Sequence, residues 1–130
     1  MAARTGDWMR QAQSDLRHGE HSLELGDFEW ACFAAQQAAE KALKAVHQER
    51  HQVVIGHSIL RLIQELEEQE IDEGLLNAAR RLDRLYIPTR YPNGFDQGAP
   101  VDYYTRADAE SALADARAIL QWSEQRIKGR

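Results

Sequence analysis

Long hydrophobic runs and cysteine pairs are both absent from this sequence of 130 residues. Cys32 is the single cysteine, which excludes an internal disulfide and a cysteine-rich zinc site. The mean hydropathy is −0.62, and no apolar stretch reaches the length of a membrane span or, at the N-terminus, of a signal peptide. The sequence therefore predicts a soluble, cytoplasmic protein that forms one domain over residues 1–130.

An excess of basic residues is also absent. Sixteen Lys and Arg against twenty-one Asp and Glu give a net charge of −5, which argues against a domain that wraps duplex DNA by bulk charge. The charge is nevertheless uneven along the chain. Residues 65–73 hold six acidic residues and no base, whereas residues 80–90 hold one acidic residue, Asp83, and four arginines: Arg80, Arg81, Arg84 and Arg90.

Strand patterns and prolines are scarce. The three prolines all lie between residues 88 and 100, and Val53-Val54-Ile55 is the only β-branched run. Ala, Leu, Glu, Gln and Arg, which favour helix, dominate the composition. The fold class predicted is all-α: an up-and-down antiparallel bundle of about five helices, in which short connections join antiparallel neighbours.

Local signals place the helix ends. Gly26-Asp27 separates a first helix from a second that spans about residues 28–49. Ser58 or His57 caps a third helix, and Asp72 caps a fourth that reaches Tyr86 before Pro88 stops it. Residues 87–104 form a long loop, and a capping box at Thr105 and Asp108 starts the last helix.

Signatures of common catalytic sites are missing as well. The sequence has no H-E-x-x-H, no G-x-S-x-G and no glycine-rich phosphate loop. His47 and His51 are four residues apart, but Arg50 lies between them, so we predict no metal site and no cofactor. His57 is interpreted as a residue that fixes its connection by hydrogen bonding, and Cys32 as a buried apolar side chain. Catalysis by paired carboxylates stays open.

The chain resembles a known family over nearly its whole length. The resemblance rests on GDFEWACFAAQQAAEKALKA at residues 26–45, Gly56-His57-Ser58-Ile59, Arg90-Tyr91-Pro92 and an alanine-rich last helix. This combination resembles the HEPN domain (higher eukaryotes and prokaryotes nucleotide-binding). It implies a helical bundle that dimerises, binds a nucleotide and works beside a minimal nucleotidyltransferase as a toxin–antitoxin or two-component pair.

Several branches of that family are metal-independent ribonucleases with the motif R-x(4–6)-H. Arg90 matches the arginine of the motif, but residues 91–97 read YPNGFDQ and contain no histidine. Arg50 and His57 give the only match, which we interpret as chance. We therefore expect no ribonuclease activity from the protein alone. Tyr91, Tyr103 and Tyr104 are candidate acceptors for modification by a partner transferase.

The arginines beside aromatic residues suggest an anion site. Guanidinium groups bind phosphate bidentately and aromatic rings stack on bases. Pro88 and Pro92 restrict the backbone around Arg90, which reduces the entropy that its side chain loses on binding. The predicted phosphate-binding set is Arg84, Arg90, Tyr91, Arg80, Arg81 and Lys44. The alternative is structural: Arg90 pairs with Asp83 or Asp96, and Lys44 forms a helical pair with Glu40.

Three functions compete at this point: a nucleotide- or RNA-binding accessory subunit, a ribonuclease toxin and a purely structural dimerisation module. The missing histidine disfavours the second, and the arginine cluster favours the first. A homodimer is predicted because the last helix has more apolar residues than one inward face needs. These residues are Ile119, Leu120, Trp122 and Ile127.

Overall fold

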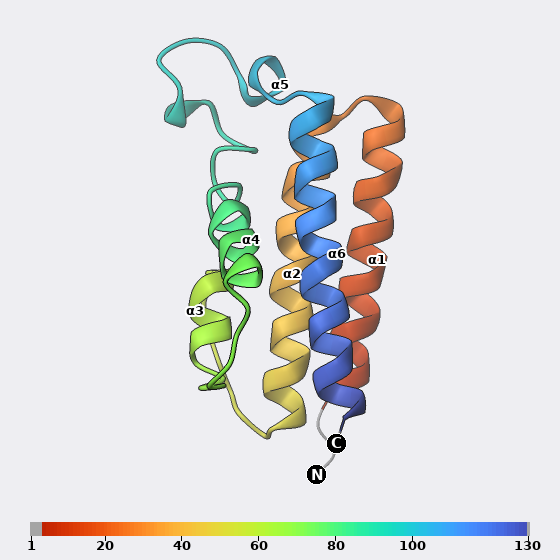
Figure 1. The fold of residues 1–130 in the computed structure, drawn as a ribbon. Coiled ribbons are helices and arrows are strands. Elements are labelled where there is room, and N and C mark those ends of the chain that lie inside the picture. Colours follow the sequence, from red (N-terminus) through yellow and green to blue (C-terminus); the bar gives the residue numbers. More distant parts are fainter. Residues whose placement is uncertain (1–3, 130) are drawn as a thin grey trace.

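The computed structural model describes residues 4–129 and is all-helical over that range (Figure 1). Three long helices, α1 (Thr5–Leu25), α2 (Phe28–Glu49) and α6 (Arg106–Lys128), form one packed group. The shorter α3 (Ile59–Gln64) and α4 (Glu73–Asp83) lie beside α2 and α6. Within this range, no helix combines the length and the apolar character that crossing a membrane requires.

The α1–α2 hairpin confirms the predicted boundary. Gly26 caps α1 with a left-handed φ of 82°, and α2 begins at Phe28. Helix α2 has a fully buried alanine face, which lets its neighbours approach closely; this face consists of Ala31, Ala35, Ala38, Ala42 and Ala45. Gly19 marks the tightest approach on α1, because a Cβ atom there would lie 2.8 Å from Leu113 Cδ2 and 3.2 Å from Ala34 Cβ. A side chain at this position would force α1 away from α2 and α6.

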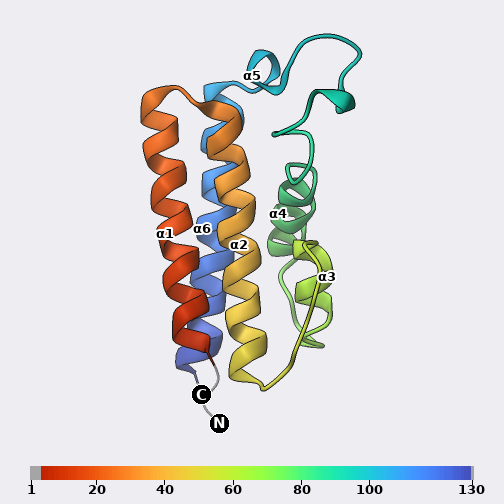
Figure 2. The same ribbon diagram turned by 180° about the vertical axis from the view of Figure 1, so that it is seen from behind.

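One pair of neighbours departs from the antiparallel arrangement. Helices α2 and α6 both run toward the end of the molecule where the two termini lie, so they are parallel (Figures 1 and 2). The intervening residues return the chain to the far end through α3, α4 and the segment that follows. The capping box at the start of α6 is present as predicted, with Thr105 Oγ1 accepting from the Asp108 amide.

The fourth helix is shorter than predicted. Helix α4 ends at Asp83, and hydrogen-bonded turns continue to Arg90. Thr89 is buried in these turns and donates to the Leu85 carbonyl at 2.6 Å, so the segment is folded. The predicted loop 87–104 contains a 3₁₀ turn (Pro92–Gly94) and α5 (Pro100–Tyr103), where proline at the first helical position fits because it has no amide hydrogen to satisfy.

The apolar residues of the last helix are not surplus. Ile119 and Leu120 are buried, and Trp122 and Ile127 pack against the core of the same chain. These residues are covered within the chain, so they give no support to the predicted homodimer, which stays a prediction. Exposed aliphatic side chains lie instead on the connection after α2, where Val53 is 90% exposed and Ile55 is 89% exposed.

Candidate functional site

Arg90 lies at the centre of an aromatic cluster. Its Cζ atom lies 4.2 Å from the ring centroid of Phe33, 4.7 Å from that of Tyr86 and 5.1 Å from that of Tyr91. Its Nε and Nη2 atoms donate to the Tyr86 carbonyl at 2.9 and 2.5 Å. Among residues 4–129, no group accepts a hydrogen bond from Nη1. The guanidinium is thus held in position while part of its donor capacity stays free.

A groove of about 280 Å³ opens beside this guanidinium, and we call it the Arg90 groove. Trp30 on α2 is half exposed, and so is Tyr91, which follows Arg90. Exposed aromatic rings next to a cation can stack on a base while the cation binds its phosphate. The groove is lined by Glu29, Trp30, Thr89, Arg90, Pro92, Ala99, Pro100 and Val101.

His57 packs on the other side of the same cluster. Its imidazole stacks on Tyr86, with centroids 4.4 Å apart and an angle of 18° between the planes. Nδ1 donates to Glu40 Oε1 at 3.1 Å, a role that follows from the buried carboxylate being an acceptor. The Gln36 side chain donates to the His57 carbonyl at 3.0 Å. The prediction that His57 fixes its connection by hydrogen bonding is confirmed.

Glu40 joins this cluster to Lys44. Its side chain is 5% exposed, and Oε2 accepts from Lys44 Nζ at 3.0 Å. The helical pair predicted from the sequence is therefore present, but it is buried and shared with His57. Within residues 4–129, no cluster of three histidine, cysteine or acidic side chains could hold a metal ion.

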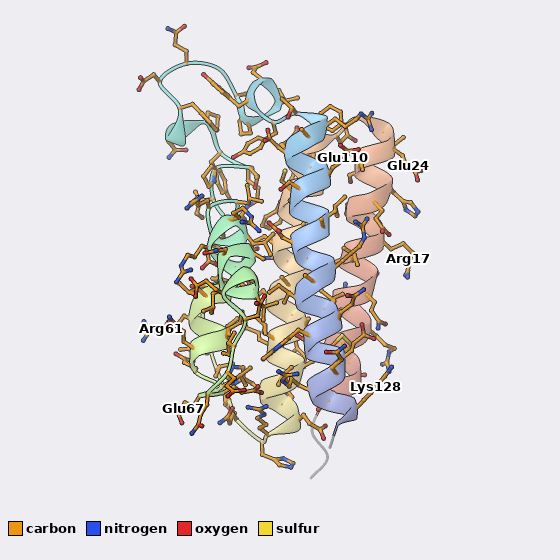
Figure 3. All side chains as sticks on the ribbon, in the orientation of Figure 1. Arg17, Glu24, Arg61, Glu67, Glu110 and Lys128 are labelled. Atoms are coloured by element: carbon orange, nitrogen blue, oxygen red, sulfur yellow. The ribbon has the colours of Figure 1, made fainter. Side chains whose placement is uncertain are left out.

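The other predicted site residues do not gather around Arg90. Arg80 donates to Glu73 and Asn77, and Arg81 forms a bidentate pair with Asp115 at 2.9 Å for both bonds. Arg84 lines a separate pocket of about 240 Å³. Further charged residues point outward on opposite sides of the molecule, such as Arg17 on α1 and Arg61 on α3 (Figure 3). Of the predicted set, Arg90 and Tyr91 lie together, and Lys44 connects to them through Glu40 and His57.

A family model described as the HEPN domain matches residues 5–127. The chain belongs to the HEPN family. The structure of TT1696 from Thermus thermophilus is similar at 51% identity and a TM-score of 0.93, covering 95% of this chain and 98% of that one. An archaeal HEPN homologue, ST0689, is similar at 38% identity and a TM-score of 0.82, covering 95% of this chain and 98% of that one.

A curated relative is also similar along most of its length. It is 29% identical over 126 residues, which cover 88% of this chain and 82% of the relative. Its name is "Putative toxin MJ1304", from Methanocaldococcus jannaschii.

The loose R-x(6)-H match in this HEPN chain does not form a shared site. The Arg50 guanidinium donates to the Leu66 carbonyl at 3.2 Å and to Glu68 at 2.5 Å, whereas His57 lies on Tyr86. Glu68 also accepts from Arg126. Burial alone would raise the pKa of Glu68, but the hydrogen bonds from the two arginines hold that pKa below its usual value.

Cys32 is fully buried, as predicted. Burial raises the pKa of its thiol to about 12, with smaller contributions from Asp108 and Glu29. The thiol is therefore protonated near neutral pH and is not a nucleophile.

Sequence reasoning assigned no role in the site to several members of the cluster: Trp30, Phe33, Gln36 and Tyr86. Trp30, Phe33 and Gln36 lie within seven residues of one helix, each three residues after the one before. This spacing, which places two aromatic side chains and one polar side chain on the same side of a helix, was the available signal. Their contact with Arg90 depends on the path of residues 50–90, which no local pattern specifies.

Proposed function

We propose that this HEPN chain is a nucleotide- or RNA-binding accessory subunit, and that the guanidinium of Arg90 binds a phosphate group of the ligand. The observation that carries the proposal is the guanidinium held by three rings, with a free donor beside a groove walled by Trp30. A guanidinium already fixed loses little side-chain entropy on binding. A stacked base adds about 1–3 kcal/mol.

Variants of Arg90 test this proposal. Arg90→Ala is expected to weaken binding of ATP, GTP or a short RNA by about tenfold or more, because a charge-assisted hydrogen bond is worth roughly 1.5–3 kcal/mol. Arg90→Lys keeps the charge without the planar fork, so we expect a smaller loss. Titration calorimetry measures both, and Arg84→Ala is the matched control, since Arg84 lies in a different pocket.

A second variant separates binding from folding. Arg90→Ala also removes the bonds to the Tyr86 carbonyl, so its melting temperature is expected to fall. Trp30→Ala leaves those bonds intact and removes one wall of the groove. We expect it to weaken binding with little change in melting temperature. Unchanged affinity in both variants would assign Arg90 to structure alone.

We further propose that the subunit acts beside a minimal nucleotidyltransferase, in a pair of toxin–antitoxin or two-component type. The support is family membership together with the relative whose name is "Putative toxin MJ1304". Co-purification from the native host, followed by identification of bound proteins and nucleotides, tests the pairing. Recovery of the chain without a transferase would contradict it.

A homodimer is part of the same proposal. Its support is the exposed pair Val53 and Ile55, which is costly to leave in water. Sedimentation at micromolar concentration is expected to show twice the mass of 14.9 kDa. The double variant Val53→Ser, Ile55→Ser is expected to shift that equilibrium toward the monomer. A species of 14.9 kDa alone in the unaltered protein would contradict the dimer.

One observation favours a second candidate function, RNA cleavage. The Glu40–His57 pair orients an imidazole that shares Tyr86 with Arg90, and histidine is the usual proton acceptor near neutral pH. In such cleavage the 2′-oxygen attacks phosphorus while His57 takes its proton. The bond from phosphorus to the 5′-oxygen breaks, the 5′-oxygen takes a proton from water, and a 2′,3′-cyclic phosphate remains.

The accessory function predicts binding without cleavage, because hydrogen bonding and stacking already account for His57. Incubating structured RNA with the purified protein is therefore expected to leave the RNA intact. Cleavage that is abolished by His57→Ala but not by His51→Ala would establish the second function instead. His51 is an exposed control six residues away.

A further inference from the structure

One side of α2 carries a stripe of partly exposed residues along its whole length. The members recur at helical spacings of four, four, three and four, and the intervening positions of α2 between them are buried. Figure 2 shows α2 between α1 and the α3–α4 pair, with one side uncovered by a helix. We call this stripe the α2 face, and it consists of Phe33, Gln37, Lys41, Lys44 and Gln48.

At one end of the α2 face lies the Arg90 groove, because Phe33 contacts Arg90. At the other end lies a cavity of about 500 Å³, which we call the Trp8 cavity. Lys44 Nζ lies 5.7 Å from the centroid of the Trp8 ring. The cavity is lined by Arg4, Asp7, Trp8, Arg10, Gln11 and Lys41.

An unbroken series of contacts joins the two ends. Lys44, which lies over Trp8, donates to Glu40, and Glu40 accepts from His57. His57 stacks on Tyr86, whose ring also lies against Arg90. The series therefore joins Trp8 to Arg90 through Lys44, the buried carboxylate of Glu40 and the stacked rings of His57 and Tyr86.

The α2 face and the two hollows at its ends together differ in charge balance from the whole chain. They hold five cations, Arg4, Arg10, Lys41, Lys44 and Arg90. Four acidic side chains lie among them: Asp7, Asp15 and Glu40, each in an ion pair, and Glu29, which lines the Arg90 groove. Five cations against four carboxylates leave a local balance of +1 on a chain with a net charge of −5, which favours an anionic ligand.

We propose that the α2 face binds a single-stranded RNA several nucleotides long, with one end in the Arg90 groove and the other in the Trp8 cavity. The inference rests on the proposed function for the Arg90 end only. Phosphates bind the cations and bases stack on Trp8 and Trp30, a combination typical of single-strand binding. An acidic peptide would match the charge but would have no bases for the two indole rings.

The geometry of α2 sets the length of RNA required. Trp30 and Lys41 are separated by about 16 Å along the axis, at roughly 1.5 Å per residue. At about 3.4 Å per stacked nucleotide, the RNA needs roughly five steps to cover that distance. A dinucleotide therefore occupies one end, whereas an octanucleotide reaches both.

The test is fluorescence anisotropy with labelled uridine oligonucleotides. The unaltered protein is expected to bind the octanucleotide much more tightly than the dinucleotide. Arg10→Glu is expected to weaken octanucleotide binding by about tenfold, with a smaller dependence on salt. Arg10 is exposed, so this variant folds normally, and Arg17→Glu is the matched control on the outer side of α1.

The outcomes separate this inference from the proposed function. Octanucleotide binding that falls in Arg90→Ala and not in Arg10→Glu would overturn the inference and leave the proposed function standing. If Arg90→Ala leaves the affinity for both oligonucleotides unchanged, the proposed function is overturned. If polyglutamate displaces the labelled octanucleotide as well as unlabelled RNA does, the α2 face recognises negative charge alone. That result also overturns the inference.

Discussion

Replacing Glu40 with alanine is expected to lower the free energy of unfolding by about 3–5 kcal/mol, the typical cost of removing one partner of a buried ion pair. The Glu40 carboxylate is 5% exposed and Lys44 is 13% exposed, so the lysine ammonium would be left without its counter-charge away from water. His57 would also lose the acceptor that fixes its ring on Tyr86. The effect therefore reaches the candidate site as well as the core.

Urea unfolding followed by circular dichroism measures this loss. Glu40→Gln keeps an oxygen acceptor at nearly the same volume, so it is expected to lose less than Glu40→Ala. Glu49→Ala, in the last turn of the same helix, is the control and is expected to change stability by no more than about 0.5 kcal/mol. A loss of that small size in Glu40→Ala would contradict the description of Glu40 as the link between α2 and the His57 connection.

Replacing Asp83 with alanine is expected to cost about 3 kcal/mol, from the loss of charge-assisted hydrogen bonds worth roughly 1.5–3 kcal/mol each. Its carboxylate accepts from the Ser58 hydroxyl at 2.8 Å and from the amides of Ile59 and Leu60 at 2.6 and 3.2 Å. These bonds fix the start of α3 to the end of α4. Because α3 has six residues, it has little helical stability of its own.

Hydrogen exchange locates the effect of Asp83→Ala. Amides of α3 are expected to lose protection first, while those of α1 and α2 exchange as in the unaltered protein. Asp96→Ala, an exposed change in the segment before α5, is the control. Uniform loss of protection across all helices would show that the contact stabilises the whole fold rather than the α3 junction.

The three long helices could be predicted because their signals are local. Gly26 determines the end of α1, and the capping box determines the start of α6. The spacing of the alanines determines which side of α2 is buried. Each signal lies within a few residues of the feature that it determines. The predicted bounds of α2, 28–49, agree with the structure for this reason. The early end of α4 and the parallel course of α6 depend on long-range packing, which local spacing does not reveal.

The candidate site could be predicted only in part. Arg90 and Tyr91 are neighbours in the sequence, so their association needed no knowledge of the fold. Phe33 and His57 reach the same cluster from other segments, and neither contact has a sequence signature. The arginine cluster of residues 80–90 is contiguous in sequence, but it divides in space. Arg80 pairs with Glu73, whereas Arg81 and Arg84, three residues apart, line one pocket that does not include Arg90.

Nuclear magnetic resonance of the tryptophan indole N–H groups tests the central claim, binding at the Arg90 groove, most directly. Trp30 lines the groove, whereas Trp122 packs beneath Arg126 and serves as an internal control. Adding a short single-stranded RNA is expected to shift the Trp30 resonance in the unaltered protein and to leave the Trp122 resonance in place. In Arg90→Ala the same shift of Trp30 is expected to require about tenfold more RNA or more. A Trp30 resonance that stays unmoved in the unaltered protein at saturating RNA would contradict the account.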